Sequence, residues 1–178
     1  HVFELRTIKD EYEIDEMRRA IEITEIAFTR LIQDTRPGLN TWEMKKDLDA
    51  DLINLGAYGF SFDSSIRFIK GNPLPGVLKH GDSLCLDVGV RVDSGYCSDM
   101  GRNWPVTLEK ETKDYMERAA QAQEEGIKNI REGLTGNRVL ELANEINADL
   151  GFQQTVRTGH QVGLDVHDYT MPHAPSFG

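Results

Sequence analysis

The sequence predicts a chain of mixed helices and strands that is arranged as two related halves. Three observations support this. Residues 84–92 alternate apolar and polar side chains with a period of two, which is typical of a half-buried strand. In other segments apolar residues recur at spacings of three and four, which is typical of amphipathic helices. Two of the helical segments are each preceded and followed by a glycine, and the second segment with its glycines lies 95 residues after the first.

The first two helices are expected in the N-terminal third of the chain. One runs from about Lys9 to Thr35, where Arg36-Pro37-Gly38 ends it. Its apolar stripe consists of Ile14, Met17, Ile21, Thr24, Phe28 and Leu31. The next begins at Asn40 or Thr41, both good N-caps, and ends at Gly56. Its inward residues are Met44, Leu48, Leu52 and Leu55. One or two strands are expected within 58–69.

An antiparallel hairpin is expected over residues 84–104, because Asp93-Ser94-Gly95 is turn chemistry and a β-compatible run follows it. With the turn centred on Asp93, Asp87 and Asp99 stand directly opposite each other on one face. Two carboxylates ~5 Å apart repel each other unless a cation or a shared proton offsets the repulsion. A metal ion is the simplest positive partner.

Two more helices are expected, from about Lys110 to Glu132 and from Thr135 or Asn137 to Leu150. The fourth repeats the frame of the second. Arg36-Pro-Gly-Leu-Asn leads into a helix that ends at Leu55-Gly56, and Arg131-Glu-Gly-Leu-Thr leads into one that ends at Leu150-Gly151. The constant offset indicates an internal duplication with a pseudo-twofold site between the halves. A chance recurrence of glycines is the alternative.

Composition narrows the function classes. The net charge of −10, from 20 basic and 30 acidic residues, argues against nucleic acid or an anionic membrane surface as the main partner. The same charge suits a metal site or a cationic substrate end. No apolar run approaches the roughly 20 residues that span a bilayer. Cys85 and Cys97 are not opposed in the expected hairpin, and we interpret them as reduced thiols of a cytoplasmic protein.

Three residues are the first candidates for chemistry. Asp87 and Asp99 are candidate metal ligands, with a solvated strand face as the alternative. His160 has a glycine on either side within three residues, which leaves the backbone room to bring the imidazole against a ligand. A structural histidine is the alternative there. Two carboxylates and one imidazole suit Mn, Co or Zn, and two such ions can act together in a hydrolase.

These segments resemble the creatinase/aminopeptidase (pita-bread, M24-type) metallopeptidase family. The stretch from Asp87 to Arg102 is similar to that family's D-x-G…G-Y-x-S-D-x-x-R segment. The stretch from Gly159 to His167 is similar to its G-H-G-x-G-x-x-x-H segment. The motif Gly-Tyr-x-Ser-Asp looks more like the prolidase and Xaa-Pro aminopeptidase branch than like methionine aminopeptidase. The resemblance covers the chain from about Ile8 onward.

The resemblance implies a fold and a set of roles. The fold is α+β, a pita-bread with a pseudo-twofold duplication, whose helices lie outside a curved, mainly antiparallel sheet. Asp87, Asp99 and His160 fall on metal-ligand positions for two divalent ions (Mn, Co or Zn). His167 falls on the position of a catalytic, substrate-binding histidine that handles protons. The implied activity is a metal-dependent exopeptidase, of the Xaa-Pro dipeptidase or aminopeptidase type, that cleaves Xaa-Pro bonds with a metal-bridged hydroxide. Peptides or dipeptides are the implied substrates, and the full-length protein is expected to be a homodimer.

The chain departs from the family pattern in several places. It stops at Gly178, before two glutamates that the family supplies as further ligands, and a family histidine upstream of the turn at 78–82 is absent. Asp87 and Asp99 are 12 residues apart where the family usually has 11. Gly101 replaces a threonine and Gln161 replaces a glycine. Residues 1–178 are therefore expected to be a single pita-bread catalytic domain, incomplete for catalysis, without the prolidase-type N-terminal domain and the C-terminal end.

Two other functions remain open at this point. The main alternative is a non-catalytic pita-bread domain that serves as a protein-binding module. Against it, a protein without catalysis has no chemical reason to retain Asp87, Asp99, His160 and His167 together. A creatinase-like amidinohydrolase is the other option, but that branch works without metal and does not keep the aspartate pair.

Overall fold

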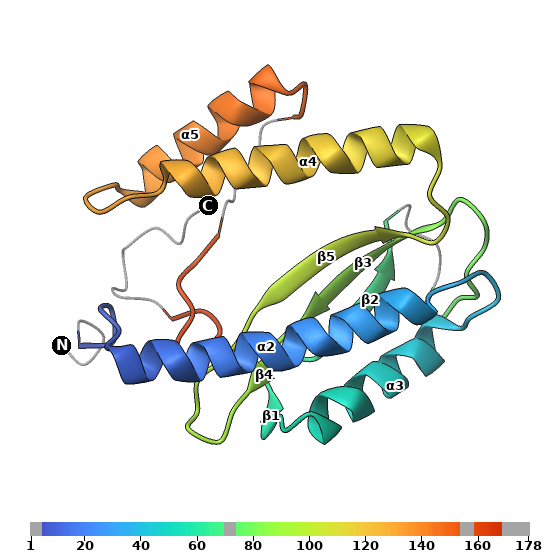
Figure 1. Cartoon of the computed structure of the whole chain (residues 1–178), viewed down its shortest axis with the longest axis horizontal. Helices are drawn as coiled ribbons and strands as arrows, with labels where there is room; N and C mark the ends of the chain where they lie inside the picture. Colours follow the sequence, from blue (N-terminus) through green and yellow to red (C-terminus); the bar gives the residue numbers. More distant parts are fainter. Residues whose placement is uncertain (1–4, 70–73, 154–158, 169–178) are drawn as a thin grey trace. The chain divides into compact units, whose positions relative to one another are not determined.

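The computed structural model describes residues 5–69, 74–153 and 159–168, which belong to two compact units. The first unit contains the chain up to Leu108 together with Val162–Asp168, and the second contains Glu109–Gln161. Among the described residues, no helix is both long enough and apolar enough to span a bilayer. The elements, labelled in Figure 1, are α2 (Glu11–Asp34), α3 (Thr41–Asn54), β1 (Gly59–Phe60), β2 (Ser65–Phe68), β3 (Ser83–Val88), β4 (Val90–Arg91), β5 (Met100–Pro105), α4 (Lys110–Asn129) and α5 (Gly136–Asp149).

Local capping fixes where the first helices begin. Asp10 caps α2: its side chain accepts from the Glu13 N–H at 2.9 Å, and the Glu13 carboxylate accepts from the Asp10 N–H at 2.8 Å. Asn40 caps α3 by accepting from the Trp42 N–H at 2.8 Å. Both helices are confirmed to within two residues at every end.

The buried face of α2 differs from the predicted stripe. Thr24 and Phe28 are buried as predicted, but Ile21 is 39% exposed. The face is centred on Ala20, Thr24 and Ala27 instead. A pattern built from large apolar side chains does not reveal this face, because its middle consists of small residues that let the helix lie close to the layer beneath.

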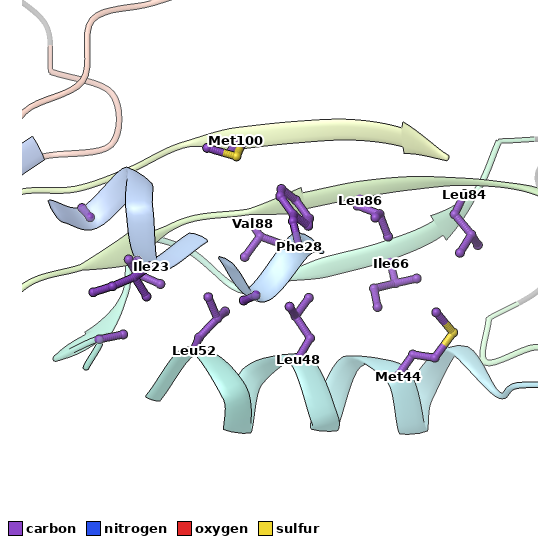
Figure 2. Packing of buried hydrophobic residues seen from close by; sticks show 14 of the residues in the cluster. Ile23, Phe28, Met44, Leu48, Leu52, Ile66, Leu84, Leu86, Val88 and Met100 are labelled. Carbon is purple, nitrogen blue, oxygen red and sulfur yellow. The ribbon is translucent and has the colours of Figure 1, made fainter. Parts of the chain in front are cut away.

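The core of the first unit fills the space between the helices and a three-stranded antiparallel sheet in the order β2-β3-β5. Along β3 the predicted alternation is confirmed, since Leu84, Leu86 and Val88 are all fully buried. Figure 2 shows side chains of α3 pointing toward these strands, with Phe28 of α2 beside them. The α3 residues in this layer are Met44, Leu48 and Leu52, which are buried as predicted.

The register of the hairpin differs from the prediction by two residues. Asp87 pairs with Gly101, and Arg91 forms a bridge with Cys97. The Gly95 N–H donates to the Val92 carbonyl, and Gly95 takes a φ of 98°. This is a three-residue loop whose last residue is left-handed, which moves the centre of the turn from Asp93 to Ser94. Asp99 therefore does not stand opposite Asp87.

The second unit repeats the helical frame of the first. The bounds of α3 and α5 correspond at both ends, Thr41 to Gly136 and Asn54 to Asp149, with an offset of 95 residues. The four glycines that flank the two helices all have positive φ: Gly38 at 94° and Gly133 at 86°, Gly56 at 106° and Gly151 at 77°. Since only glycine adopts this conformation without strain, the repeated glycines serve the same backbone role in both copies, as a duplication predicts.

Candidate metal centre

Asp99 is positioned by the residue before it. The Ser98 hydroxyl is buried and lies 2.8 Å from the Thr24 hydroxyl of α2, while it accepts from the Val90 N–H at 2.9 Å. The Ser98 N–H in turn donates to the Val90 carbonyl at 2.8 Å. Because these groups are out of contact with water, leaving any of them unpaired is costly. The network holds the backbone next to Asp99 against both α2 and β4.

Gly89 gives this backbone the room that it needs. A Cβ at position 89 would overlap the carbonyl of Ser98 and would lie 2.8 Å from the Phe62 ring. Only a residue without a side chain allows the two arms of the hairpin to approach so closely here.

Three side chains of α2 bind the turn of the same hairpin. Tyr96 donates its hydroxyl hydrogen to Glu13 at 2.6 Å, and Ser94 donates to Glu16 at 2.5 Å. One turn further along α2, Arg19 donates to Asp93 at 2.7 Å. Burial, and then the hydrogen bond to Glu13, raise the pKa of Tyr96 to about 12. The hydrogen bond from Tyr96, followed by that from the Asp10 N–H, lowers the pKa of Glu13.

The segment 162–168 docks on this hairpin within the first unit (Figure 1). The Cys97 N–H donates to the Gly163 carbonyl at 2.8 Å, and the Gly163 N–H donates to the Asp165 carbonyl at 3.0 Å. As a result a carboxylate oxygen of Asp99 and a ring nitrogen of His167 lie within 4.8 Å of each other. Two of the four predicted site residues, 68 positions apart in the sequence, are thereby brought together.

The other two predicted site residues are Asp87, which lies on β3, and His160. Asp87 is outside the donor group that contains Asp99 and His167, among the residues that the structure describes. Its carboxylate is 41% exposed and lies 3.6 Å from Nη2 of Arg67 on the neighbouring strand β2. His160 belongs to the second unit, where its Nδ1 lies 3.1 Å from the Gln161 carbonyl oxygen.

A set of charged residues around His167 was not identified from the sequence. Asp168 is only 4% exposed, and its carboxylate lies 2.8 Å from Arg6 and 3.6 Å from Lys9. Arg6 also binds Asp165 at 2.8 Å. No local pattern links position 6 to position 168. The only sequence signal was a carboxylate directly after a candidate histidine.

The Asp99–His167 pair fits a divalent metal ion by the chemistry of its donors. One carboxylate oxygen and one imidazole nitrogen suit Mn, Co or Zn. Two donors to one such ion lie up to about 4 Å apart, since each bond is about 2 Å long. The observed separation, within 4.8 Å, therefore puts the His167 ring next to the place that an ion bound by Asp99 would occupy.

Comparisons with known proteins identify the family of this chain. The model of metallopeptidase family M24 matches residues 15–177. A methionine aminopeptidase of Clostridium perfringens is 32% identical over 187 residues, which cover 96% of this chain and 73% of that protein. Among solved structures, an X-Pro aminopeptidase from Thermotoga maritima matches 99% of this chain and 51% of its own, with 29% identity and a TM-score of 0.85. An Xaa-Pro dipeptidase from Bacillus anthracis matches 99% and 50%, with 28% identity and a TM-score of 0.83.

The chain spans about half the length of the first curated relatives that it matches. The family match nevertheless covers nearly all of the chain, and it includes both segments that meet at Asp99 and His167. The chain therefore belongs to metallopeptidase family M24, and its α+β architecture is the pita-bread fold of that family.

Proposed function

We propose that this chain is part of a metal-dependent exopeptidase that cleaves Xaa-Pro bonds. The observation that carries the proposal is the meeting of Asp99 with His167, since it joins the two most specific motifs of the sequence at one point. A carboxylate and an imidazole at that distance combine a metal donor with a group that can accept or donate a proton.

The ligand set of the proposal extends to Asp87 and His160. Asp99 is two residues from the position opposite Asp87, and such diagonal neighbours in an antiparallel pair are only about 7–8 Å apart. One residue separates His160 from Val162 of the first unit, so the Cα atoms of these two residues are at most about 7 Å apart. Two divalent ions held there would supply Lewis acidity and would lower the pKa of water. The metal, Mn, Co or Zn, is part of the proposal.

His167 has a different role in this proposal. Its imidazole hydrogen-bonds the substrate and takes or gives the proton that moves during cleavage. The adjacent carboxylate of Asp99 holds an ion, while the hairpin and the docked segment keep the two side chains in reach of each other.

Two observations favour the Xaa-Pro branch. The stretch Gly95-Tyr96-Cys97-Ser98-Asp99 has the sequence pattern of that branch. The X-Pro aminopeptidase and the Xaa-Pro dipeptidase described above are 29% and 28% identical to this chain. Methionine aminopeptidase is the second candidate function, because one such relative shares 32% of its residues over 73% of its length. A non-catalytic module is not favoured, since all four site residues are retained.

A substrate comparison on the full-length protein tests the proposal. The protein is stripped of metal, reloaded with Mn²⁺ or Co²⁺, and assayed on Ala-Pro, Ala-Pro-Ala, Met-Ala-Ser and Ala-Ala-Ala. Cleavage of the two proline peptides alone supports the proposal, and their relative rates separate a dipeptidase from an aminopeptidase. Preferential release of methionine from Met-Ala-Ser supports the second candidate instead. No cleavage of any peptide by the metal-loaded protein would overturn both.

Two further parts of the proposal concern the whole protein. We place it in the cytoplasm, because Cys85 and Cys97 are both free thiols. We also propose a homodimer. Sedimentation of the full-length protein tests the second point.

A further inference from the structure

Asp168 is an acidic residue in an unusual setting, directly after His167. Its side chain is 4% exposed, and one oxygen, Oδ2, has no hydrogen-bond partner among the described residues. A buried carboxylate is unfavourable unless cations accompany it. Arg6 supplies one at 2.8 Å from Oδ1, and Lys9 supplies a second at 3.6 Å from Oδ2.

The same carboxylate closes the segment 162–168 onto itself. A Cβ at Gly163 would overlap the Asp168 carboxylate and would lie 3.2 Å from Cε of Lys9. Asp168 therefore packs directly on the backbone of Gly163. That backbone is bound in turn to the hairpin that carries Asp99, since the Gly163 carbonyl accepts from the Cys97 N–H at 2.8 Å. The two ends of the segment are thus fixed, and His167 lies immediately beside one of them.

We propose that Asp168, held by Arg6 and Lys9, is a positioning group that sets His167 against Asp99. The two cations come from the segment before α2 and lie near the start of that helix, so they fix the histidine segment from the opposite end of the sequence. Asp165 also binds Arg6 at 2.8 Å, but its side chain is 60% exposed, so water solvates it in any position. The expected effect on kcat rests on the proposed function, whereas the expected ordering of residues 162–168 does not.

The test compares Asp168→Asn with two matched controls in the full-length protein. Asp165→Asn removes the exposed partner of the same arginine, and Arg18→Gln removes a cation of α2 whose pair with Asp15 is exposed on both sides. In the metal-free protein, Asp168→Asn is expected to speed hydrogen exchange of the amides in 162–168, and the controls are not. In the Mn²⁺-loaded protein it is expected to lower kcat by up to about 10²-fold, with a smaller change in KM.

A charge-retaining variant of Arg6 and a double variant of Arg6 and Asp168 distinguish a positioning role from a general loss of stability. Arg6→Lys retains the charge and is expected to keep most of the activity, whereas Arg6→Gln is not. The double variant Arg6→Gln with Asp168→Asn is expected to lose no more kcat than Asp168→Asn alone, because both changes act through one contact. If Asp168→Asn does not fold, Lys9→Met is a milder test, because it removes only the Lys9 cation from beside Asp168.

Two results would overturn the inference. One is a folded Asp168→Asn protein whose hydrogen exchange in 162–168 equals that of the wild type. The other is an equal effect of Asp165→Asn. If the wild-type protein cleaves no Xaa-Pro peptide, the proposed function fails, and the exchange data on the metal-free protein still decide whether Asp168 orders the segment.

Discussion

Tyr96 and Glu13 are joined by a hydrogen bond of 2.6 Å across 83 positions of sequence. The same Glu13 carboxylate accepts from the Asp10 N–H, so one side chain both caps α2 and holds the hairpin that carries Asp99. The start of the helix and the position of the candidate site are therefore coupled through a single group.

This coupling predicts that the stability of the protein depends on pH in the acid range. The pKa of Glu13 is lowered in the folded protein, so its stabilising effect is present above the ordinary value of 4.5 and is lost as the pH falls through the folded-state value. Tyr96→Phe removes the largest cause of that shift. Urea unfolding at pH 7 and at pH 3.5 is expected to show a smaller acid-dependent loss in Tyr96→Phe than in the wild type. Tyr58→Phe, at an exposed position, is the control.

The burial of Tyr96, together with the same hydrogen bond, predicts that stability changes in the opposite direction at alkaline pH. The pKa of Tyr96 is raised from 10.0 to about 12, so its contribution to stability is complete below pH 10 and is lost as the pH rises toward 12. Unfolding measured at pH 9 and pH 11 is expected to converge for wild type and Tyr96→Phe. A Tyr96→Phe protein that loses as much stability as the wild type in this range would contradict the assignment.

Burial predicts which apolar side chains support the first unit. Leu86 is fully buried in the middle of β3, and its replacement by alanine is expected to cost about 2–5 kcal/mol in the free energy of unfolding. Ile21→Ala on the exposed side of α2 is expected to cost less than about 0.5 kcal/mol. Chemical denaturation of both variants measures the difference. Equal costs would mean that the face of α2 is wrongly assigned.

The close approach of the hairpin arms predicts a glycine-specific effect. Gly89→Ala is expected to cost about 1–3 kcal/mol, because the new methyl group meets the Ser98 carbonyl, which belongs to backbone and cannot move aside. The Gly101→Ala change, on the partner strand, meets only the Leu86 carbonyl at 3.8 Å and is expected to be nearly neutral. Since Ser98 precedes Asp99, calorimetry with Mn²⁺ is expected to show weaker binding in Gly89→Ala but not in Gly101→Ala.

The two histidines are predicted to differ in what they bind. His160→Ala is expected to lower metal content and activity together, since we propose His160 as a ligand. His167→Ala is expected to keep its metal and to lose kcat by ~10²–10⁴-fold, as for a proton-transfer group. Metal counted by emission spectrometry in the same full-length samples that are assayed distinguishes them. Loss of metal in His167→Ala would make His167 a ligand to the ion beside Asp99.

Local sequence was sufficient where local chemistry decides the structure. Asn40 and the period-two run of β3 identified the start of α3 and the buried strand, because a cap or an alternation acts within a few residues. The hairpin register was wrong by two residues, since the left-handed Gly95 lengthens the turn in a way that the letters Asp-Ser-Gly do not specify.

The supports of the site could not be predicted at all. Arg6 lies 159 positions from Asp165, and nothing in either neighbourhood indicates the other. Asp99 and His167 were identified as candidates only by motif, and their proximity depends on a backbone bond between Cys97 and Gly163. Long-range pairs of this kind depend on the fold as a whole, so a reading of single segments misses them.

The bond between Cys97 and Gly163 also sets an order of events during translation. A ribosome completes the hairpin some 60 residues before it makes the segment that docks on it. A nascent chain released at residue 150 would therefore display Asp99 without His167. Because chains fold from the N-terminus as they emerge, the Asp99 carboxylate gains its histidine neighbour only after some 60 further residues have been made.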